Sequence, residues 1–215
     1  MTTTSLDDLS AAIAKNELSV SPQDCERLCR YTELLWDWNT RINLTRHTDV
    51  DSFVSRDLID TLQLSAHINS GQSVLDVGSG GGVPGIPLAI LRPDLTIALA
   101  ESTGKKANVL TTIVQKTDLD ITVYAARAED VLKKQKFDVL TARAVAPIRK
   151  LLFWLQRRSG AFGRLMMIKG PRWVAERDEA EAEGLLENVA LEVIGEYRTP
   201  GHDSNSVILS VTYNR

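Results

Sequence analysis

The chain is predicted to fold as an α/β protein, with a doubly wound, mostly parallel sheet behind an N-terminal helical cap. From residue 73 onward, short apolar runs alternate with helix-like segments. Such alternation is typical of parallel strands joined by right-handed crossovers. The first apolar run leads directly into a glycine-rich stretch, residues 78–82. Residues 1–70 lack the alternation and carry helix-start signals instead.

Those first 70 residues are expected to form a cap rather than an independent domain. Ser5 and Ser21 can each cap a helix, and an acid three residues later complements its N-terminus. Pro22 occupies the favoured first position of the second helix. That helix is predicted to end near residue 39, and a further helical stretch is predicted at 50–68.

The second domain is expected to span residues 71–215. Its first five strands are predicted at 74–77, 96–100, 121–124, 137–141 and 164–168, separated by helices at 85–92, 103–117, 127–133 and 147–156. A helix near 173–187 follows, and two strands at about 189–198 and 206–213 complete a set of seven. The turn between these last strands contains Pro200 and Gly201, and the pair is expected to form a hairpin.

Composition excludes several classes of protein. None of the 215 residues belongs to an apolar run of the ~18–20 residues that a membrane helix needs. The N-terminus also lacks a basic, apolar signal peptide, so a cytoplasmic protein is expected. Cys25 and Cys29 have neither redox nor metal-binding spacing, and the three histidines are scattered. No metal is therefore assigned, and a monomer is expected.

Charge is strongly segregated along the chain. Residues 127–177 hold thirteen Lys/Arg and four Asp/Glu, while the whole chain has a net charge of −3. Such a segment creates a local positive field, and we expect it to contact phosphates through Arg149, Lys150, Arg157, Arg158 and Arg172. Solvated helix faces that happen to be basic are the alternative.

The stretch from Asp76 to Gly82 indicates a nucleotide-type cofactor. Glycines let the backbone turn sharply and approach a ligand closely. A dinucleotide site would require Gly-x-Gly-x-x-Gly directly after the strand, but residue 83 is Val83. Asp-x-Gly-x-Gly-x-Gly instead resembles motif I of the class I S-adenosylmethionine (SAM) methyltransferases. This resemblance also implies seven strands with an antiparallel one near the end.

Further candidate site residues follow the other strands, because ligands of open α/β sheets bind at the carboxyl ends of the strands. Glu101 can accept both ribose hydroxyls, and Ala126–Glu129 can address an adenine edge. Arg143 is expected beside the reacting methyl group as the catalytic residue, orienting the cofactor or the acceptor. Lys169 and Gly170 follow the fifth strand.

The acceptor is predicted largely by what these strand ends lack. Ala142-Arg-Ala-Val145 contains neither the Asn/Asp-Pro-Pro-aromatic box of exocyclic-amine enzymes nor an Asp to activate a ribose hydroxyl. Both cysteines lie in the cap, so a cytosine-C5 nucleophile is also missing. Guanine N7 carries a free lone pair and needs no base. A SAM-dependent methyltransferase for another RNA, a protein or a small molecule, and a non-enzymatic nucleotide-binding module, remain alternatives.

From about Tyr31 to the C-terminus, the chain resembles the bacterial 16S rRNA guanine-N7 methyltransferase G family, also called glucose-inhibited division protein B. The similarity rests on Trp38-Asn-x-x-Ile-Asn-Leu-Thr45, Asp76 to Pro87, Glu101-Ser102 with Lys105-Lys106, Arg127-Ala-Glu129, Ala142-Arg-Ala144 and Lys169-Gly170. The resemblance implies methylation of one guanine N7 in the decoding-region pseudoknot of 16S rRNA, with naked rRNA or the small ribosomal subunit as partner.

The resemblance also implies the cofactor contacts. They fall at Gly78, Val83, Ala128, Glu129 and Arg143, beside the Asp76, Gly80 and Glu101 already singled out. One departure is visible: Asp57 follows Arg56 where the family usually has a histidine. If that histidine contacts RNA, the contact is altered here.

Overall fold

The computed structural model describes residues 5–200 and 205–214 of the chain. Its strands are β1 Ser73–Val77, β2 Thr96–Ala100, β3 Ile121–Tyr124, β4 Phe137–Arg143, β5 Phe162–Lys169, β6 Val189–Arg198 and β7 Asn205–Tyr213. These ranges agree with the predicted strands to within two residues at each end. Gly201 of the predicted turn lies outside the described residues.

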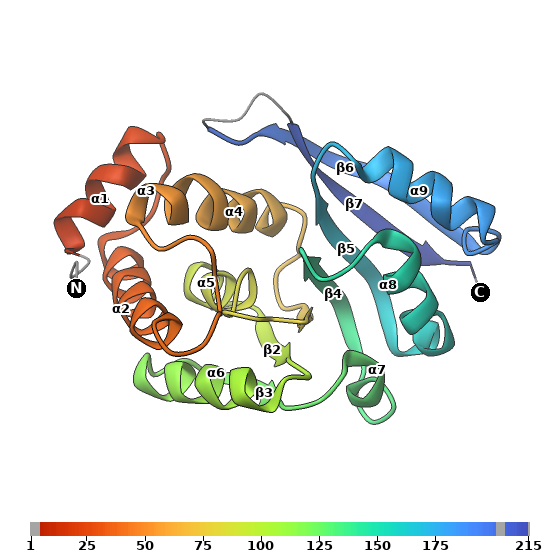
Figure 1. Ribbon diagram of the computed structural model, residues 1–215, viewed down its shortest axis with the longest axis horizontal. Coiled ribbons are helices and arrows are strands. Elements are labelled where there is room, and N and C mark those ends of the chain that lie inside the picture. The colour runs from red at the N-terminus through yellow and green to blue at the C-terminus, as the bar shows by residue number, and fades with distance from the viewer. Residues whose placement is uncertain (1–4, 201–204, 215) are drawn as a thin grey trace.

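These strands form one seven-stranded sheet in the order β3-β2-β1-β4-β5-β7-β6 (Figure 1). β1 to β5 run parallel, whereas β7 is antiparallel to both β5 and β6. The doubly wound, mostly parallel sheet that the sequence predicts is therefore confirmed. The strand order reverses between β1 and β4, which is where ligands bind in such sheets.

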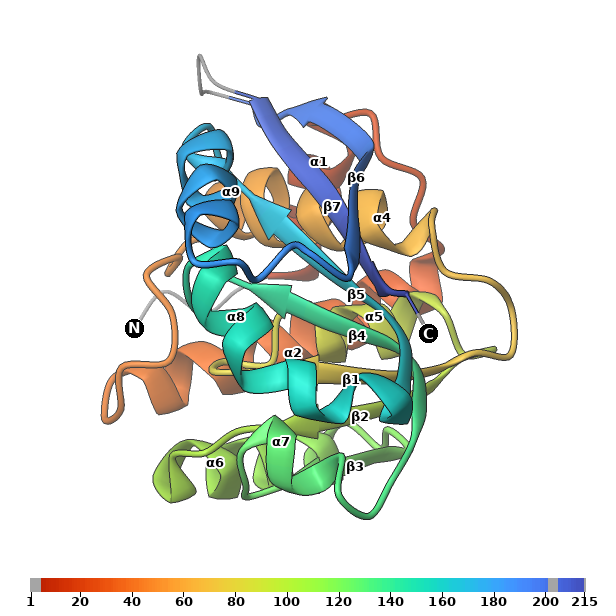
Figure 2. The same ribbon diagram turned by 90° about the vertical axis from the view of Figure 1, so that its right-hand side faces the viewer.

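Helices cover both faces of the sheet, as Figures 1 and 2 show. They are α5 Gly85–Leu91, α6 Gly104–Lys116, α7 Ala128–Val131, α8 Ile148–Leu155, a 3₁₀ segment (η2) at Gln156–Ala161, and α9 Trp173–Ala182. Successive strand residues enter opposite layers, as expected for a pleat of period two. Val74 joins the core under α5 and α6, and Leu75 joins the core under α7 and α8.

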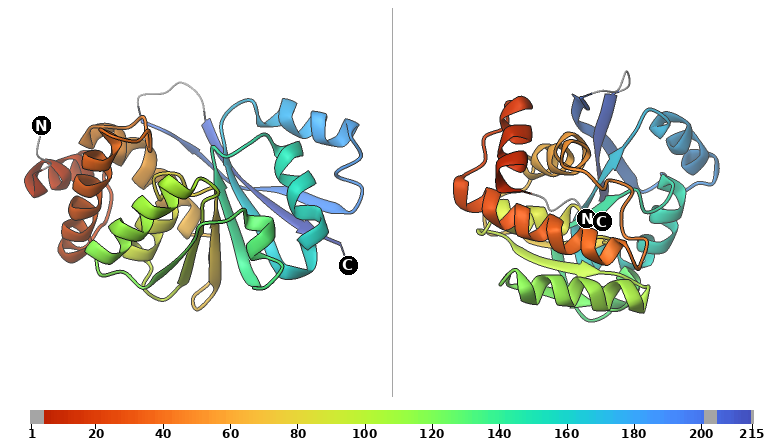
Figure 3. Two further views of the ribbon diagram at one scale, coloured as in Figure 1. Left: turned by 60° about the horizontal axis from the view of Figure 1, so that its bottom comes forward. Right: turned by 60° about the vertical axis from the view of Figure 1, so that its left-hand side comes forward.

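The N-terminal region is helical, with α1 Leu6–Lys15, α2 Pro22–Asn39, α3 Val50–Ser52, a π-helical segment (η1) Phe53–Leu58, and α4 Ile59–Ser65. Ser5 and Ser21 accept hydrogen bonds from the backbone N–H groups of Asp8 and Asp24, so both predicted helix caps are confirmed. The cap helices lie beside α5 and α6 (Figure 3) and share one buried core with them. No helix within the described residues is long and apolar enough to cross a membrane.

Candidate active site

The loop from β1 to α5 forms the centre of the site. The N–H groups of Gly78 and Ser79 donate to the carbonyl of Ala100 at 2.8 and 3.2 Å, which fixes the loop against the end of β2. Gly80 adopts φ +56°, and a Cβ there would meet only one atom within 4 Å, the Gly78 carbonyl oxygen at 3.9 Å. Gly80 therefore borders open space, as a backbone cradle for a ligand requires.

Glu101 holds this cradle in place. The residue is buried, its Oε2 accepts from the Gly80 N–H at 2.9 Å, and its Oε1 accepts from the Thr103 N–H at 2.7 Å. A carboxylate has about four lone-pair sites. Both oxygens can therefore accept further donors, such as the two hydroxyls of a ribose, without releasing the loop.

Asp76 lies behind the loop and is almost fully buried. Its Oδ1 accepts from the Thr141 hydroxyl at 3.0 Å, whereas its Oδ2 has no hydrogen-bond partner within the described residues. Burial raises the pKa of Asp76 to about 6, against the opposing effects of the Thr141 and Ser79 side chains, the Gly85 backbone and the Arg143 charge. At the end of β1, one oxygen of a buried carboxylate has therefore lost its hydration without gaining a hydrogen bond from the described residues in return.

The end of β3 adds the next predicted residues. The Glu101 N–H donates to the Tyr124 carbonyl at 3.0 Å, so the ends of β2 and β3 are joined. Ala128 begins α7 and is buried, whereas Glu129 is half-buried and forms no ion pair in the described parts of the chain. Val83 is half-buried where the loop enters α5. The predicted residues from Asp76 to Glu129 therefore follow three neighbouring strands at one edge.

Arg143 ends β4, two residues beyond the partner of Asp76 in the sheet. Its side chain is 16% exposed and donates to two carboxylates of the cap. Nη2 lies 2.5 Å from Asp57 Oδ1, and Nη1 lies 2.9 Å from Asp60 Oδ2. Burial opposes the positive charge, but the two carboxylates outweigh it, so the pKa of Arg143 is raised.

Asp57 has a different environment from the one that an RNA contact would need. It is fully buried, and the same Oδ1 that accepts from Arg143 lies 2.8 Å from His47 Nδ1. Its Oδ2 has no partner within the described residues. The aspartate that replaces the usual histidine therefore faces the guanidinium in the interior.

The cation at the end of β5 also has partners. Lys169 Nζ donates to Glu176 Oε2 and to the Ala146 carbonyl, both at 2.7 Å, and the same Oε2 accepts from the Ile148 N–H at 3.0 Å. Lys169 thus ties the loop after β4 to α9. That loop contains Ala144 in the left-handed region, φ 53°.

Sequence reasoning missed the roles of Asp60, His47 and Glu176 because no motif pairs these residues with their partners, and some of those partners lie far away in the chain. Asp60 and Arg143 are 83 residues apart, for example. The family motif around Asn39 also has a structural function: Oδ1 accepts from the N–H groups of Leu44 and Thr45. Among the described residues, no group of three or more His, Cys, Asp and Glu side chains could hold a metal ion.

The sheet order, the glycine cradle at β1, and the acid after β2 define a class I SAM-dependent methyltransferase. Comparison with known proteins agrees. An O-methyltransferase from Bacillus cereus, solved with SAH, matches with a TM-score of 0.60 at 16% identity, over 98% of each chain. That likeness concerns the fold.

The sequence comparisons are more specific. The family model for GidB, rRNA small subunit methyltransferase G, matches residues 24–202. The ribosomal RNA small subunit methyltransferase G of Rhodopirellula baltica is 51% identical over 170 residues, covering 79% of this chain and 74% of that protein. Its counterpart from Neisseria meningitidis is 36% identical over 208 residues, covering 94% and 96%. The chain belongs to the rRNA small subunit methyltransferase G family.

Proposed function

We propose that this protein transfers the methyl group of SAM to N7 of one guanine in the decoding-region pseudoknot of 16S rRNA. The choice of guanine N7 as acceptor rests on one observation: the charged groups at the ends of β4 and β5 are already paired with oppositely charged side chains. Arg143 is bound by Asp57 and Asp60, and Lys169 by Glu176. None of them is placed as a free general base. A nucleophile with a ready lone pair fits such a site.

The residues of this chain then bind and orient rather than transfer protons. When bound, SAM supplies an electrophilic methyl group. Glu101 would accept the ribose hydroxyls, Gly78 and Gly80 would border the methionine portion, and Ala128 with Glu129 would address the adenine. Val83 would pack beside the cofactor. Arg143 would orient the cofactor carboxylate or the guanine, as a planar donor with fixed directions.

Asp76 contributes through charge. Arg143 binds Asp57 and Asp60 and also lies near enough to Asp76 to lower its pKa, so three carboxylates share one guanidinium and acid is in excess there. Methyl transfer to N7 uses the lone pair of the ring, releases no proton, and leaves the positive charge on the base. Carboxylates placed near developing positive charge stabilise it most where water is excluded.

The RNA is proposed to lie across the carboxyl edge of the sheet. Exposed cations follow the strands there: Lys105 is the second residue of α6 after β2, Arg127 precedes α7 after β3, and Arg172 precedes α9 after β5. None of the three forms an ion pair in the described parts of the chain. We call Lys105, Arg127 and Arg172 the rim cations.

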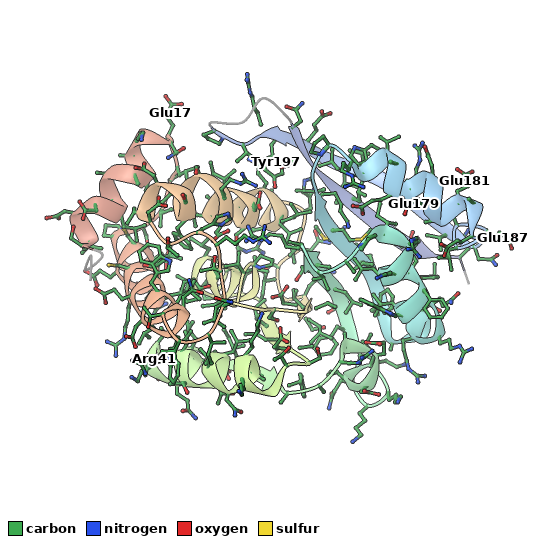
Figure 4. The ribbon with its side chains drawn as sticks, in the orientation of Figure 1. Glu17, Arg41, Glu179, Glu181, Glu187 and Tyr197 are labelled. Atoms are coloured by element: carbon green, nitrogen blue, oxygen red, sulfur yellow. The ribbon has the colours of Figure 1, made fainter. Side chains whose placement is uncertain are left out.

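The face formed by α8 and α9 is a weaker candidate than the sequence suggested. Arg149 pairs with Glu179 at 3.3 Å and Glu183 at 3.2 Å. Arg158 donates to the backbone carbonyl of Glu129. Figure 4 places Glu179, Glu181 and Glu187 together at the α9 end of the molecule. Acidic side chains therefore offset much of the positive charge that this segment carries.

The reaction is tested with tritiated SAM and four acceptors: small ribosomal subunits, naked 16S rRNA, total cell protein and a small-molecule extract. The proposal expects label in guanine N7 of the rRNA, and the comparison of the first two acceptors identifies the substrate form. Calorimetry should also show binding of SAM and SAH. Label confined to protein or small molecules, or tighter binding of NAD than of SAH, contradicts the proposal.

The rim is tested by salt dependence. Arg127→Ala combined with Arg172→Ala should weaken binding to 16S rRNA and flatten the log K against log salt slope by about 0.7–0.9 per lost phosphate contact. SAM affinity should stay the same. The matched control is Arg157→Ala, an exposed arginine on η2. If only the control variant flattens the slope, the RNA surface lies on α8 and η2 instead of at the rim cations.

We further propose a monomeric cytoplasmic protein that needs no metal, divided into a cap of residues 1–70 and a methyltransferase domain of residues 71–215. Sedimentation should give the monomer mass with and without SAH. Activity should survive a chelator. A dimer, or activity lost with EDTA and restored by a divalent cation, would contradict these points.

A further inference from the structure

The guanidinium of Arg143 is oriented by the cap rather than by its own strand. Its two terminal nitrogens each donate to a different carboxylate, Asp57 from η1 and Asp60 from α4. Two separate acceptors fix the plane of a guanidinium more firmly than one does. The direction of its remaining N–H groups therefore depends on where these carboxylates are held.

Asp60 is held in turn by a residue from the far edge of the sheet. The Tyr197 hydroxyl, on β6, donates to Asp60 Oδ1 at 2.5 Å across 137 residues of chain. The two oxygens of Asp60 thus have separate tasks, because Oδ2 serves Arg143 and Oδ1 serves Tyr197. Figure 4 shows Tyr197 at the end of β6, next to the helix that carries Asp60.

The phenol is suited to act as a fixed neutral donor. Tyr197 is 9% exposed, and burial together with the nearby Asp60 charge raises its pKa far above the usual range. It therefore keeps its proton at neutral pH and donates to the carboxylate. A donor of this kind restricts the rotation of Asp60 without neutralising the charge that Arg143 needs.

The strand that carries Tyr197, β6, packs closely against the cap, and this contact holds Tyr197 in place. Gly195 of β6 lies so close to His67 that a Cβ there would be 2.9 Å from the imidazole Nε2. Arg164 of β5 donates to the His67 carbonyl. The segment that follows α4 is thus tied to both β5 and β6, and Asp60 and Tyr197 meet in a fixed arrangement.

We infer that Tyr197 and Asp60 are positioning residues, which orient Arg143 for the cofactor and the acceptor without touching either. The inference rests on the proposed role of Arg143. Loss of the Tyr197 hydroxyl frees Asp60 to rotate, and Arg143 then loses one of its two fixed acceptors. Because the bond is to a charged group, we expect Tyr197→Phe to raise Kd for SAH, or lower kcat/KM, about tenfold.

The matched control is Tyr213→Phe on the neighbouring strand β7. The Tyr213 hydroxyl lies 3.4 Å from the Leu152 carbonyl on α8, away from the Arg143 cluster. Both variants remove one hydroxyl from a mostly buried tyrosine, and Tyr197→Phe should lower the melting temperature more because its bond is to a charged group, so binding and kinetics are measured well below both melting temperatures. Tyr197→Phe alone should change SAH affinity or kcat/KM. Equal, small effects of both variants on those two quantities would overturn the inference.

A double-variant cycle shows whether Tyr197 acts through Arg143. In an Arg143→Lys background, Tyr197→Phe should cause little further loss, because the geometry it maintains is already gone. Additive losses would contradict a positioning role. The proposed function is judged separately: if Arg143→Lys alone leaves both SAH affinity and rate unchanged, the role of Arg143 fails. If it reduces them and Tyr197→Phe does not, only the positioning inference fails.

Discussion

Two glycines of the β1–α5 loop should have different roles: Gly80 leaves room for the cofactor, and Gly82 leaves room for packing in the core. A Cβ on Gly80 would enter open space, whereas a Cβ on Gly82 would lie 2.6 Å from Ile86 Cδ1 and 3.2 Å from Leu110 Cδ2. Both glycines have positive φ, +56° and +101°. We therefore expect Gly80→Ala to impair binding and Gly82→Ala to impair stability.

The expected magnitudes follow from this geometry. Alanine in the left-handed region costs about 1–2 kcal/mol, partly offset by about 0.4–1 kcal/mol from the stiffer unfolded chain. Gly80→Ala should therefore cost about 1 kcal/mol, or about 2–4 °C in a chain of this size. Gly82→Ala adds about 1–3 kcal/mol of overpacking against Ile86. Its total of about 2–4 kcal/mol corresponds to about 4–16 °C.

Thermal denaturation and calorimetry with SAH separate the two effects. The extra methyl group at Gly80 should overlap the ligand and raise Kd about tenfold or more, and Gly80→Val should abolish binding. Gly82→Ala, measured well below its melting temperature, should change Kd much less. The reasoning is refuted if Gly80→Ala binds SAH normally, or if it is the less stable of the two alanine variants.

Three further predictions concern charge and helix capping. Because the pKa of Asp76 is raised to about 6 in the folded protein, its unfavourable charge appears as pH rises through that value. The cofactor-free protein should therefore lose up to about 3 kcal/mol of unfolding free energy between pH 4 and pH 7. Urea titrations should show this loss in the wild type and not in Asp76→Asn, and identical pH profiles would contradict it. Arg143→Lys should lower kcat/KM at least about tenfold, because one ammonium cannot bridge Asp57 and Asp60 as the guanidinium does; steady-state kinetics near the wild-type value would argue against that role. Ser21→Ala removes the cap of α2 and should cost about 1 kcal/mol with kcat unchanged; an unchanged melting temperature would show that the cap is dispensable.

The strands were predictable because each is a short apolar run bounded by turn residues, and the topology then places their carboxyl ends together. The helix ends were harder. The helix predicted to reach residue 187 ends at Ala182, because Gly184 adopts φ +70° and the Leu185 N–H turns back to the Ala180 carbonyl. This glycine is a stop signal that the sequence itself contains.

The other helix error has no local signal. The stretch predicted to reach residue 68 ends at Ser65, where the Arg92 guanidinium donates to the carbonyls of Ser65 and Ile68. These bonds replace the helical partners of the last carbonyls. The π-helical segment within the same stretch was likewise not predicted, since its hydrogen-bond pattern leaves no periodicity distinct from an α-helix in six residues.

Only part of the cluster around Arg143 could be predicted from the sequence. The arginine itself was singled out by its position after β4, but nothing local indicates that Asp60 or Tyr197 will reach it.

A buried ion pair of this kind is a poor stabiliser, because the cost of removing charges from water offsets most of the attraction. Here two aspartates share one guanidinium, and one carboxylate oxygen has no partner in the described parts of the chain. Well-packed apolar side chains of similar volume often stabilise such a contact as well or better. The cluster is therefore best explained by what it orients: it makes the direction of one guanidinium depend on the cap, the β4 end and the β6 edge together. Arg143 is then correctly oriented only when all three are assembled.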